Sequence, residues 1–189
     1  KNVFHNPAFA GLRESHQEVS YVEWLPNLTD DMGYQSILIT SDMGWSSEIF
    51  YFNYGTQVQS DQYGVVLGDF ESSSYRVSGG YGFGFNDWLV GARLNLYSHN
   101  FIDDYSIDMN YGFDIGAYKE FGNTSLGLVL KDVGGETEFL SQKLNLPMSV
   151  GVGVGHKFGN FTLASDVKFY EDYNSIGLGG QYDLGIASL

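Results

Sequence analysis

Apolar side chains alternate with small or polar ones over long stretches of this chain. Between Tyr75 and Phe85, aromatic and aliphatic residues hold most of every second position, and glycine, serine and arginine lie between them. The same period of two recurs over residues 88–96, 107–117 and 148–154. Because successive side chains of a strand point to opposite faces, this alternation predicts β-strands with one apolar face and one small or polar face.

The alternating runs and the turn residues between them predict about ten strands. Most of these strands hold about ten residues or more, and a strand tilted across a bilayer needs roughly 9–11. No apolar run reaches the length of about 18 residues that a transmembrane helix requires. The predicted strands lie near residues 17–25, 33–41, 45–54, 72–85, 87–99, 105–120, 123–132, 147–158, 160–170 and 174–184.

The predicted connections alternate between short turns and long loops. This sorting is typical of outer-membrane barrels, in which the long loops lie outside the cell. Short turns are predicted at Asp42–Gly44, Asn86, Phe121–Gly122 and Gly159. Long loops are predicted at Pro26–Met32, Gly55–Glu71, Asn100–Asp104, Val133–Leu146 and Glu171–Tyr173.

The second face of the strands is too small and too polar to form a protein core. A soluble β-sandwich with such a face would expose many strand glycines to water, and glycine weakens strands. A barrel in lipid inverts the arrangement, with the apolar face toward hydrocarbon and the polar face toward the lumen. The sequence therefore predicts an all-β fold, an antiparallel up-and-down transmembrane β-barrel.

Composition and charge narrow the possible partners. The chain has 189 residues, which suits one domain, and its formal net charge is -14. That charge repels a polyanion, so we expect no nucleic-acid partner. Cysteine is absent, which excludes disulfides and thiolate metal sites. The chain begins at Lys1 with no initiator methionine or hydrophobic signal region, which indicates a processed or partial chain.

Two glycine clusters superficially resemble dinucleotide-binding loops, Gly79–Gly84 and Gly151–Gly155. A phosphate-binding loop needs a strand, a turn and then a helix that holds the pyrophosphate at its N-terminus. These glycines recur with period two inside predicted strands, and no predicted helix follows them. We interpret them as a lumen-facing column that another backbone or a plug segment approaches closely.

Residues with catalytic or metal-binding chemistry form no recognisable constellation. No histidine pair has metal-ligand spacing, and no G-x-S-x-G element occurs, although a catalytic triad can also assemble in space. Acidic residues in the predicted loops lack EF-hand spacing, so we interpret them as solvated charge and not as a Ca²⁺ site. We expect no enzymatic activity, no metal and no cofactor. The residues concerned are His5, His16, His99, His156, Asp30, Asp31, Asp103, Asp104, Glu136 and Glu138.

Aromatic residues concentrate near the ends of the predicted strands. Girdles of aromatic side chains at the two lipid–water interfaces account for this distribution, and a sugar-binding platform is the sharper alternative. The residues are Trp24, Trp45, Trp88, Tyr97, Phe101, Tyr105, Phe121, Phe158, Phe169, Tyr170 and Tyr173.

Several segments, in order along the chain, resemble the PorV/PorQ family of outer-membrane proteins. The N-terminal segment Phe4–Leu12 contains Asn6-Pro7-Ala8, which is similar to the Asn-Pro-Ala segment of PorV/PorQ proteins and of FadL-type channels. Val19–Leu28 resembles the first strand of the family and its Trp-Leu turn. Further similar segments are Ile49–Gly55, Gly68–Tyr75, Ser125–Gly134 and Leu146-Pro147-Met148.

The resemblance implies a 14-stranded barrel of the FadL type, with residues 1–16 packed in the lumen and residues 17–189 forming the wall. Asn6, Pro7 and Ala8 would form the plug motif. PorV-like proteins act in type IX secretion, where they receive cargo from the translocon, recognise its C-terminal signal domain and deliver it to the surface. PorQ-like members join an attachment complex of the same pathway.

By this resemblance the protein is a non-enzymatic barrel of the bacterial outer membrane that binds secreted or surface proteins. Its partners would be the lipid bilayer and other outer-membrane or secreted proteins in a complex. The loop residues expected to contact such partners are Trp24, Leu25, Pro26, Asp69, Phe70, Glu136 and Phe139.

Two alternatives remain open. A FadL-like channel for hydrophobic small molecules needs an apolar pocket beneath the Asn6–Ala8 plug and a lateral opening in the wall. A structural subunit of an outer-membrane or surface assembly needs large protein contacts on its flanks or loops. The sequence departs from the family in having about ten predicted strands and no terminal aromatic residue. We therefore expect that the chain does not close the barrel by itself.

Overall fold

The computed structural model describes residues 3, 5–24, 31–102, 105–139 and 142–185. A short 3-10 helix, η1 (Pro7–Leu12), precedes all the strands, and no helix in these ranges is long and apolar enough to span a membrane. The strands are β1 (His16–Glu23), β2 (Met32–Thr40), β3 (Trp45–Ser60), β4 (Val66–Phe85), β5 (Trp88–Ile102), β6 (Tyr105–Phe121), β7 (Thr124–Val133), β8 (Glu136–Phe139), β9 (Gln142–Asn145), β10 (Ser149–Phe158), β11 (Phe161–Phe169) and β12 (Asn174–Tyr182).

One antiparallel sheet holds ten of the strands, in the order β1-β2-β3-β4-β5-β6-β7-β10-β11-β12. β8 and β9 pair only with each other, as a small hairpin inserted between β7 and β10. Strands that lie side by side in the large sheet also follow one another along the chain, if the inserted β8–β9 hairpin is set aside. The topology is therefore up-and-down. This confirms the predicted all-β, antiparallel arrangement and the approximate place of each sheet strand.

Three predicted long loops are wrong, because the chain there forms more strand. β3 continues to Ser60 and β4 begins at Val66, so most of the predicted loop Gly55–Glu71 is a hairpin extension. β5 and β6 likewise extend into the predicted loop Asn100–Asp104, and the predicted loop Val133–Leu146 contains β8 and β9. Polar residues such as Gln57 and Gln59 suggest a loop, yet they pair in register with β4.

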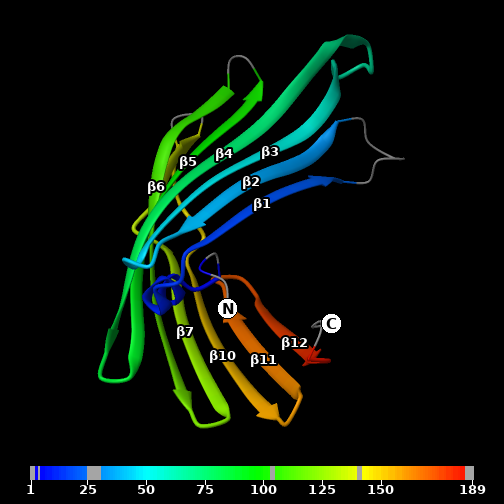
Figure 1. The fold of residues 1–189 in the computed structure, drawn as a ribbon. Helices are drawn as coiled ribbons and strands as arrows, with labels where there is room; N and C mark the ends of the chain where they lie inside the picture. Colours follow the sequence, from blue (N-terminus) through cyan, green and yellow to red (C-terminus); the bar gives the residue numbers. More distant parts are fainter. Residues whose placement is uncertain (1–2, 4, 25–30, 103–104, 140–141, 186–189) are drawn as a thin grey trace.

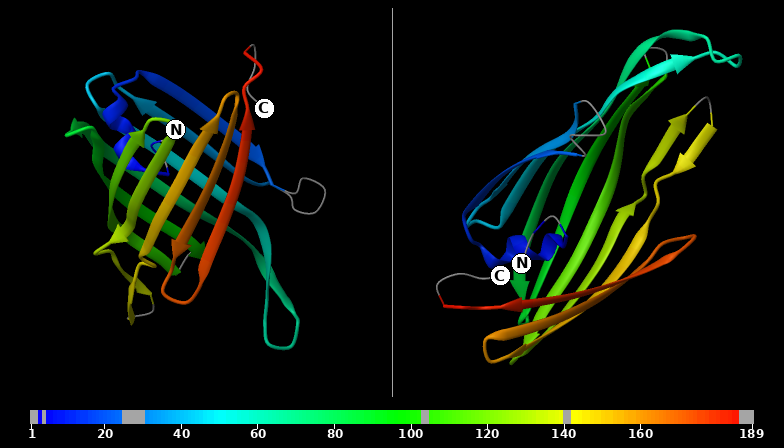
Figure 2. Two further views of the ribbon diagram at one scale, coloured as in Figure 1. Left: turned by 90° about the horizontal axis from the view of Figure 1, so that it is seen from below. Right: turned by 90° about the vertical axis from the view of Figure 1, so that its right-hand side faces the viewer.

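The sheet curves strongly about a concave side, and η1 lies against that side (Figures 1 and 2). β1 and β12 are the two edge strands. Within the described ranges no register joins β1 to β12, so the sheet is open between these edges. The short turns 41–44, 86–87, 122–123 and 159–160 lie at one end of the sheet, and the longer hairpins lie at the other.

The cross-strand register sorts the side chains of the two faces into continuous rows. One row on the convex face consists of Val19, Ile37, Ile49, Val77, Leu96 and Tyr111. The next row, on the concave face, consists of Glu18, Leu38, Glu48, Ser78, Asn95 and Gly112. The predicted two-sided alternation is therefore realised across six strands in the same register.

Candidate functional site

The N-terminal segment packs on a row of three glycines that crosses the sheet. Gly82, Gly91 and Gly116 are direct neighbours in the register of β4, β5 and β6. A Cβ atom on Gly91 would overlap the carbonyl of Pro7, and one on Gly116 would overlap the side chain of Asn6. Only glycine lets the backbone of the segment approach the sheet this closely.

Asn6 uses both ends of its side-chain amide, one to bind the sheet and the other to cap η1. Its Nδ2 donates to the carbonyl of Ala117 at 3.2 Å and to that of Leu128 at 3.0 Å. These two carbonyls belong to a registered pair of β6 and β7. Its Oδ1 accepts from the backbone N–H of Ala8 at 3.0 Å, which makes Asn6 the N-cap of η1. One side chain therefore starts the helix and attaches it to two strands.

The two residues after Asn6 complete the packed segment. Pro7 stands at the first position of η1, where its missing N–H costs no hydrogen bond, and both Pro7 and Ala8 are buried. Ala10 and Val3 pack with Leu38 of β2 in a small apolar cluster, which Phe9 covers. The segment therefore contacts β2 as well as the glycine row on β4, β5 and β6.

A buried ion pair lies beside the segment on the concave face. Arg93 of β5 faces Asp114 of β6 in register, and its Nη2 and Nε lie 2.6 and 3.1 Å from the Asp114 Oδ2. The Arg93 Nη1 also donates to the carbonyl of Val3 at 3.4 Å. Both side chains are almost fully buried, so the pair is shielded from solvent screening. Arg93 thus links the sheet to the N-terminal segment.

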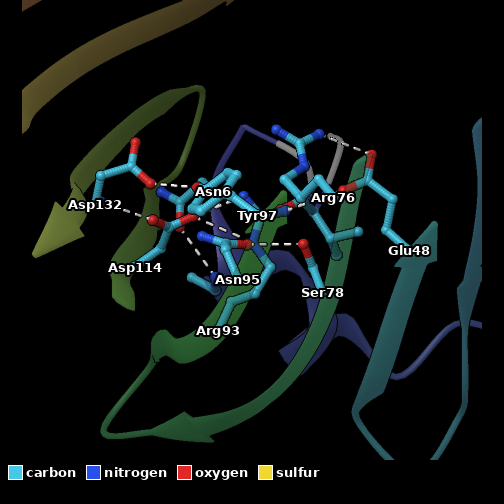
Figure 3. A network of polar contacts seen from close by, with 11 residues as sticks. Asn6, Glu48, Arg76, Ser78, Arg93, Asn95, Tyr97, Asp114 and Asp132 are labelled. Carbon is cyan, nitrogen blue, oxygen red and sulfur yellow. Dashed lines mark hydrogen bonds and ion pairs between the residues drawn. The ribbon is translucent and has the colours of Figure 1, made fainter. Parts of the chain in front are cut away.

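The other oxygen of Asp114 holds a β-bulge in β7. The register between β6 and β7 shifts between Phe113 and Ile115, so two residues, Lys131 and Asp132, lie opposite Asp114. Asp132 adopts a left-handed backbone conformation with φ 57°, and its N–H donates to the Asp114 Oδ1 at 3.0 Å. The Asp132 carboxylate accepts a hydrogen bond from the hydroxyl of Tyr97 (Figure 3). The bulge is therefore held by Asp114 of the adjacent strand β6 and by Tyr97 of β5, one strand further away.

The polar network continues toward β3. Arg76 Nη2 lies 3.1 Å from the Oε1 of Glu48, and Arg93 Nη1 lies 3.8 Å from its Oε2. The hydroxyl of Ser78 donates to the side chain of Asn95 at 2.8 Å (Figure 3). Buried charges are tolerated when each has an opposite charge and hydrogen bonds. Each side chain in the ion pairs of this network has an oppositely charged neighbour, and among the described residues the buried Oε2 of Glu48 has only the Arg93 ion pair and no hydrogen bond.

A cavity of about 440 Å³ opens beside the N-terminal segment, over the concave side of β7, β10 and β11. Phe9 and Tyr118 form one wall, with ring centroids 4.8 Å apart. Lys131, Asp166 and Lys168 also line the cavity. The cavity therefore combines an aromatic wall with charged side chains.

The structure distributes the predicted site residues over several places. Asn6, Pro7 and Ala8 lie together in the packed segment described above. Trp24 follows β1 and is half exposed, while Leu25 and Pro26 lie outside the described residues. Asp69 and Phe70 lie within β4, and Glu136 and Phe139 within β8, so their placement in loops is wrong. These residues belong to separate hairpins and form no single cluster.

Sequence reasoning missed the polar network. The alternation correctly assigned Arg76, Arg93 and Asp114 to the small and polar face, but gave no partner for any of them. Tyr97 was assigned to an aromatic girdle, which is wrong, because its hydroxyl bonds Asp132 on the concave side (Figure 3). The available signal was the placement of opposite charges mid-strand on a glycine-rich face, where only a partner makes a charge tolerable.

Comparisons with models of protein families, with curated proteins and with solved structures gave no match. In the described part of the chain, no group of three or more histidine and acidic side chains could hold a metal ion. The function is therefore argued from the geometry of the sheet and from the motifs of the sequence.

Replacing Asn6 by alanine is expected to release the N-terminal segment without unfolding the sheet. The substitution leaves the carbonyls of Ala117 and Leu128 without this donor and removes the N-cap of η1, at a cost of about 1–3 kcal/mol. Trypsin should then cleave after the exposed Arg13 at least ten times faster than in the wild type. Mass spectrometry measures the rate of this cleavage. Ser20→Ala, a change on β1 outside the segment, is the control. Equal cleavage of Asn6→Ala and wild type would contradict the role of Asn6.

Removing one partner of the buried pair is expected to cost more than removing both. Arg93→Met or Asp114→Leu alone leaves a buried charge with less compensation and should lower the unfolding free energy by about 3–5 kcal/mol. The double variant should recover part of that loss. Urea unfolding of the wild type, the two single variants and the double variant, arranged as a double-mutant cycle, measures the coupling. Additive losses would mean that the two side chains act independently.

Proposed function

We propose that this chain is a non-enzymatic β-barrel protein of the bacterial outer membrane, of the PorV/PorQ type, that binds secreted or surface proteins. The observation that carries the proposal is an inverted distribution of buried residues. Among the described residues, the buried polar or charged side chains are ten and include Glu48, Arg93 and Asp114, whereas the buried hydrophobic residues are five. A protein that folds in water shows the reverse, because water favours apolar interiors.

The convex face supports a lipid environment. Its rows carry large apolar side chains that remain exposed along whole strands, from Val19 on β1 to Leu178 on β12. Monomeric soluble proteins rarely expose contiguous apolar areas of this extent. A bilayer removes the penalty, because hydrocarbon covers the apolar face while the polar network stays on the lumen side.

Aromatic residues at the short-turn end support a membrane interface. Trp45 packs on Tyr81 with ring centroids 4.7 Å apart, and Trp88 packs on Phe121 at 6.3 Å. The ammonium group of Lys119 lies 5.2 Å from the Phe121 ring centroid. Aromatic rings with a nearby cation are typical of the headgroup level, where the rings meet hydrocarbon and the charge meets water.

The lengths of the large sheet's strands, except that of β1, agree with the same proposal. β1 has 8 residues, β2, β11 and β12 have 9, and β4 has 20. A tilted strand needs roughly 9–11 residues to cross the hydrocarbon. β3 and β4 are longer than that requirement, so their hairpin would project beyond the bilayer at the end opposite the short turns.

The tip of this hairpin supports binding of a protein partner. Tyr63 is 82% exposed and Leu67 is 62% exposed, and Val65 and Val66 beside them are also exposed. The side chain of Asp61 accepts hydrogen bonds from the N–H groups of Tyr63 and Val65, which shapes the turn. An apolar tip outside the bilayer needs another surface to cover it, and a secreted or surface protein would supply one.

A FadL-like channel is the second candidate, favoured by the cavity beside Asn6 and Phe9. Transport of a hydrophobic molecule requires an apolar lining, yet Lys131, Asp166 and Lys168 line this cavity. Charged walls hold water and oppose the entry of apolar solutes. Partner binding through the projecting hairpin therefore accounts for more of the structure than channel activity does.

A matched pair of lysine substitutions on β11 tests the membrane location. Leu163 faces outward and the adjacent Ala164 faces the cavity, so Leu163→Lys places a charge in hydrocarbon and Ala164→Lys places it in the lumen. Leu163→Lys should destabilise the inserted protein by about 2–4 kcal/mol near the midplane, and Ala164→Lys should change little. Heat-modifiable migration on a gel, with protein refolded into lipid vesicles, measures both. A wild-type chain that stays soluble without detergent would refute the membrane location.

A double substitution at the hairpin tip tests partner binding. Tyr63→Ser with Leu67→Ser removes the two largest apolar side chains of the tip and should lower the recovery of secreted or surface proteins at least tenfold. The measurement is a quantitative pull-down from crosslinked outer membranes. Met43→Ser is the control, because Met43 is exposed at the opposite end of the sheet. Equal recovery with both variants would argue against this contact surface.

A further inference from the structure

The cavity over β7, β10 and β11 is an open groove with a floor of main chain. On β10 the inward positions Gly151, Gly153 and Gly155 all line it. A Cβ atom on Gly153 would have its nearest contacts at 3.6 Å, to Asp166, and at 3.8 Å, to Ser165. Gly153 therefore has free space above it, unlike Gly91 and Gly116, whose space the N-terminal segment fills.

Two lysines flank one end of this groove. Lys131 of β7 pairs in register with Ser149, and Lys168 of β11 pairs with Gly151, so the two cations come from opposite sides of β10. Asp166 lies one inward position further along β11 and supplies a single negative charge. The lining of the groove therefore carries an excess of positive charge at its Lys131 end.

The electrostatics of His5 agree with this charge balance. His5 belongs to the N-terminal segment and lines the same groove. Partial desolvation lowers the pKa of His5, and the charges of Lys131, Lys168 and Arg93 lower it further, while Asp166 opposes them. A positive field acts on the His5 ring, and the same field would attract an anionic group to the groove.

The dimensions of the groove suit a short extended chain. Gly151 and Gly155 are four residues apart on a strand, which corresponds to roughly 13 Å. That length accommodates about four residues of extended peptide. The protein already places a backbone against strand glycines, as a 3-10 helix: Pro7 and Gly11 of η1 approach the glycine row closely enough to exclude any Cβ atom there. Gly153 leaves free space for a second backbone, in a groove that also carries charged side chains.

We propose that this groove binds a short extended peptide segment with an acidic side chain, whose carboxylate lies between Lys131 and Lys168. The free space over Gly153 accepts the main chain of the segment, and the Phe9–Tyr118 wall contacts its apolar side chains. The negative formal charge of the protein makes this positive groove selective, because most other surfaces repel an acidic chain. The site is on the lumen side and is separate from the tip of the β3–β4 hairpin.

The test measures binding of synthetic peptides to the full chain in detergent micelles. The probe is fluorescein-labelled Ala-Gly-Ala-Glu-Glu, and the matched neutral probe is Ala-Gly-Ala-Gln-Gln, each followed by fluorescence anisotropy. The acidic probe should bind at least tenfold more tightly than the neutral one. Inorganic phosphate and free glutamate serve as competitors at the same concentration. The peptide assignment would be overturned if inorganic phosphate or free glutamate displaced the labelled acidic probe as well as the unlabelled acidic peptide does.

Two kinds of variant separate charge from shape. Lys168→Gln removes one cation and should weaken the acidic probe about fivefold, whereas Lys119→Gln on the convex face should not. Gly153→Val fills the free space over the floor and should weaken both probes at least tenfold. Gly79→Val is its control, because a Cβ at Gly79 meets no atom within 4 Å. The proposal would be overturned if Lys168→Gln and Gly153→Val both left binding of the acidic probe unchanged. It would also be overturned if the control variants Lys119→Gln and Gly79→Val lost that binding.

Discussion

The close contact between the N-terminal segment and the glycine row sets the requirements for the rest of the concave face. Gly82, Gly91 and Gly116 must lack side chains, because the backbone of the segment occupies that space. Once the segment lies there, the neighbouring charges lose their water and need partners. Arg93 therefore pairs with Asp114 and also bonds the carbonyl of Val3, so the segment and the ion pair stabilise each other's position.

The side-chain composition of both faces of the sheet follows from the free energy of transferring side chains between environments. Burial is costly for the charges of the concave face, and exposure to water is costly for the apolar rows of the convex face. On the concave face, burial without charge compensation would be costly, and the network from Glu48 to Asp132 provides the compensation. On the convex face, exposed apolar rows would be costly in water and are favourable in hydrocarbon. In the proposed membrane location, the polar concave face and the apolar convex face would each match their surroundings.

The sequence predicted the faces well and the contacts between strands poorly. Period-two alternation identified the strands and assigned Arg76, Arg93 and Asp114 to the inner face, because alternation is a local property. It could not pair Arg93 with Asp114, since pairing depends on the register between β5 and β6. It also placed Tyr97 in a girdle, because only the β7 bulge brings the Asp132 carboxylate to the Tyr97 hydroxyl. Gly55–Glu71 looked like a loop because residues 56–62 are mostly polar, although main-chain pairing continues through most of the segment.

The Asn6 contacts constrain the order of assembly. Asn6 bonds the carbonyls of Ala117 and Leu128, which lie 111 and 122 residues further along the chain. The N-terminal segment therefore has no complete docking site until β6 and β7 have paired. Docking of Asn6 is thus a late step in folding, because it depends on the pairing of strands that lie far away in the chain.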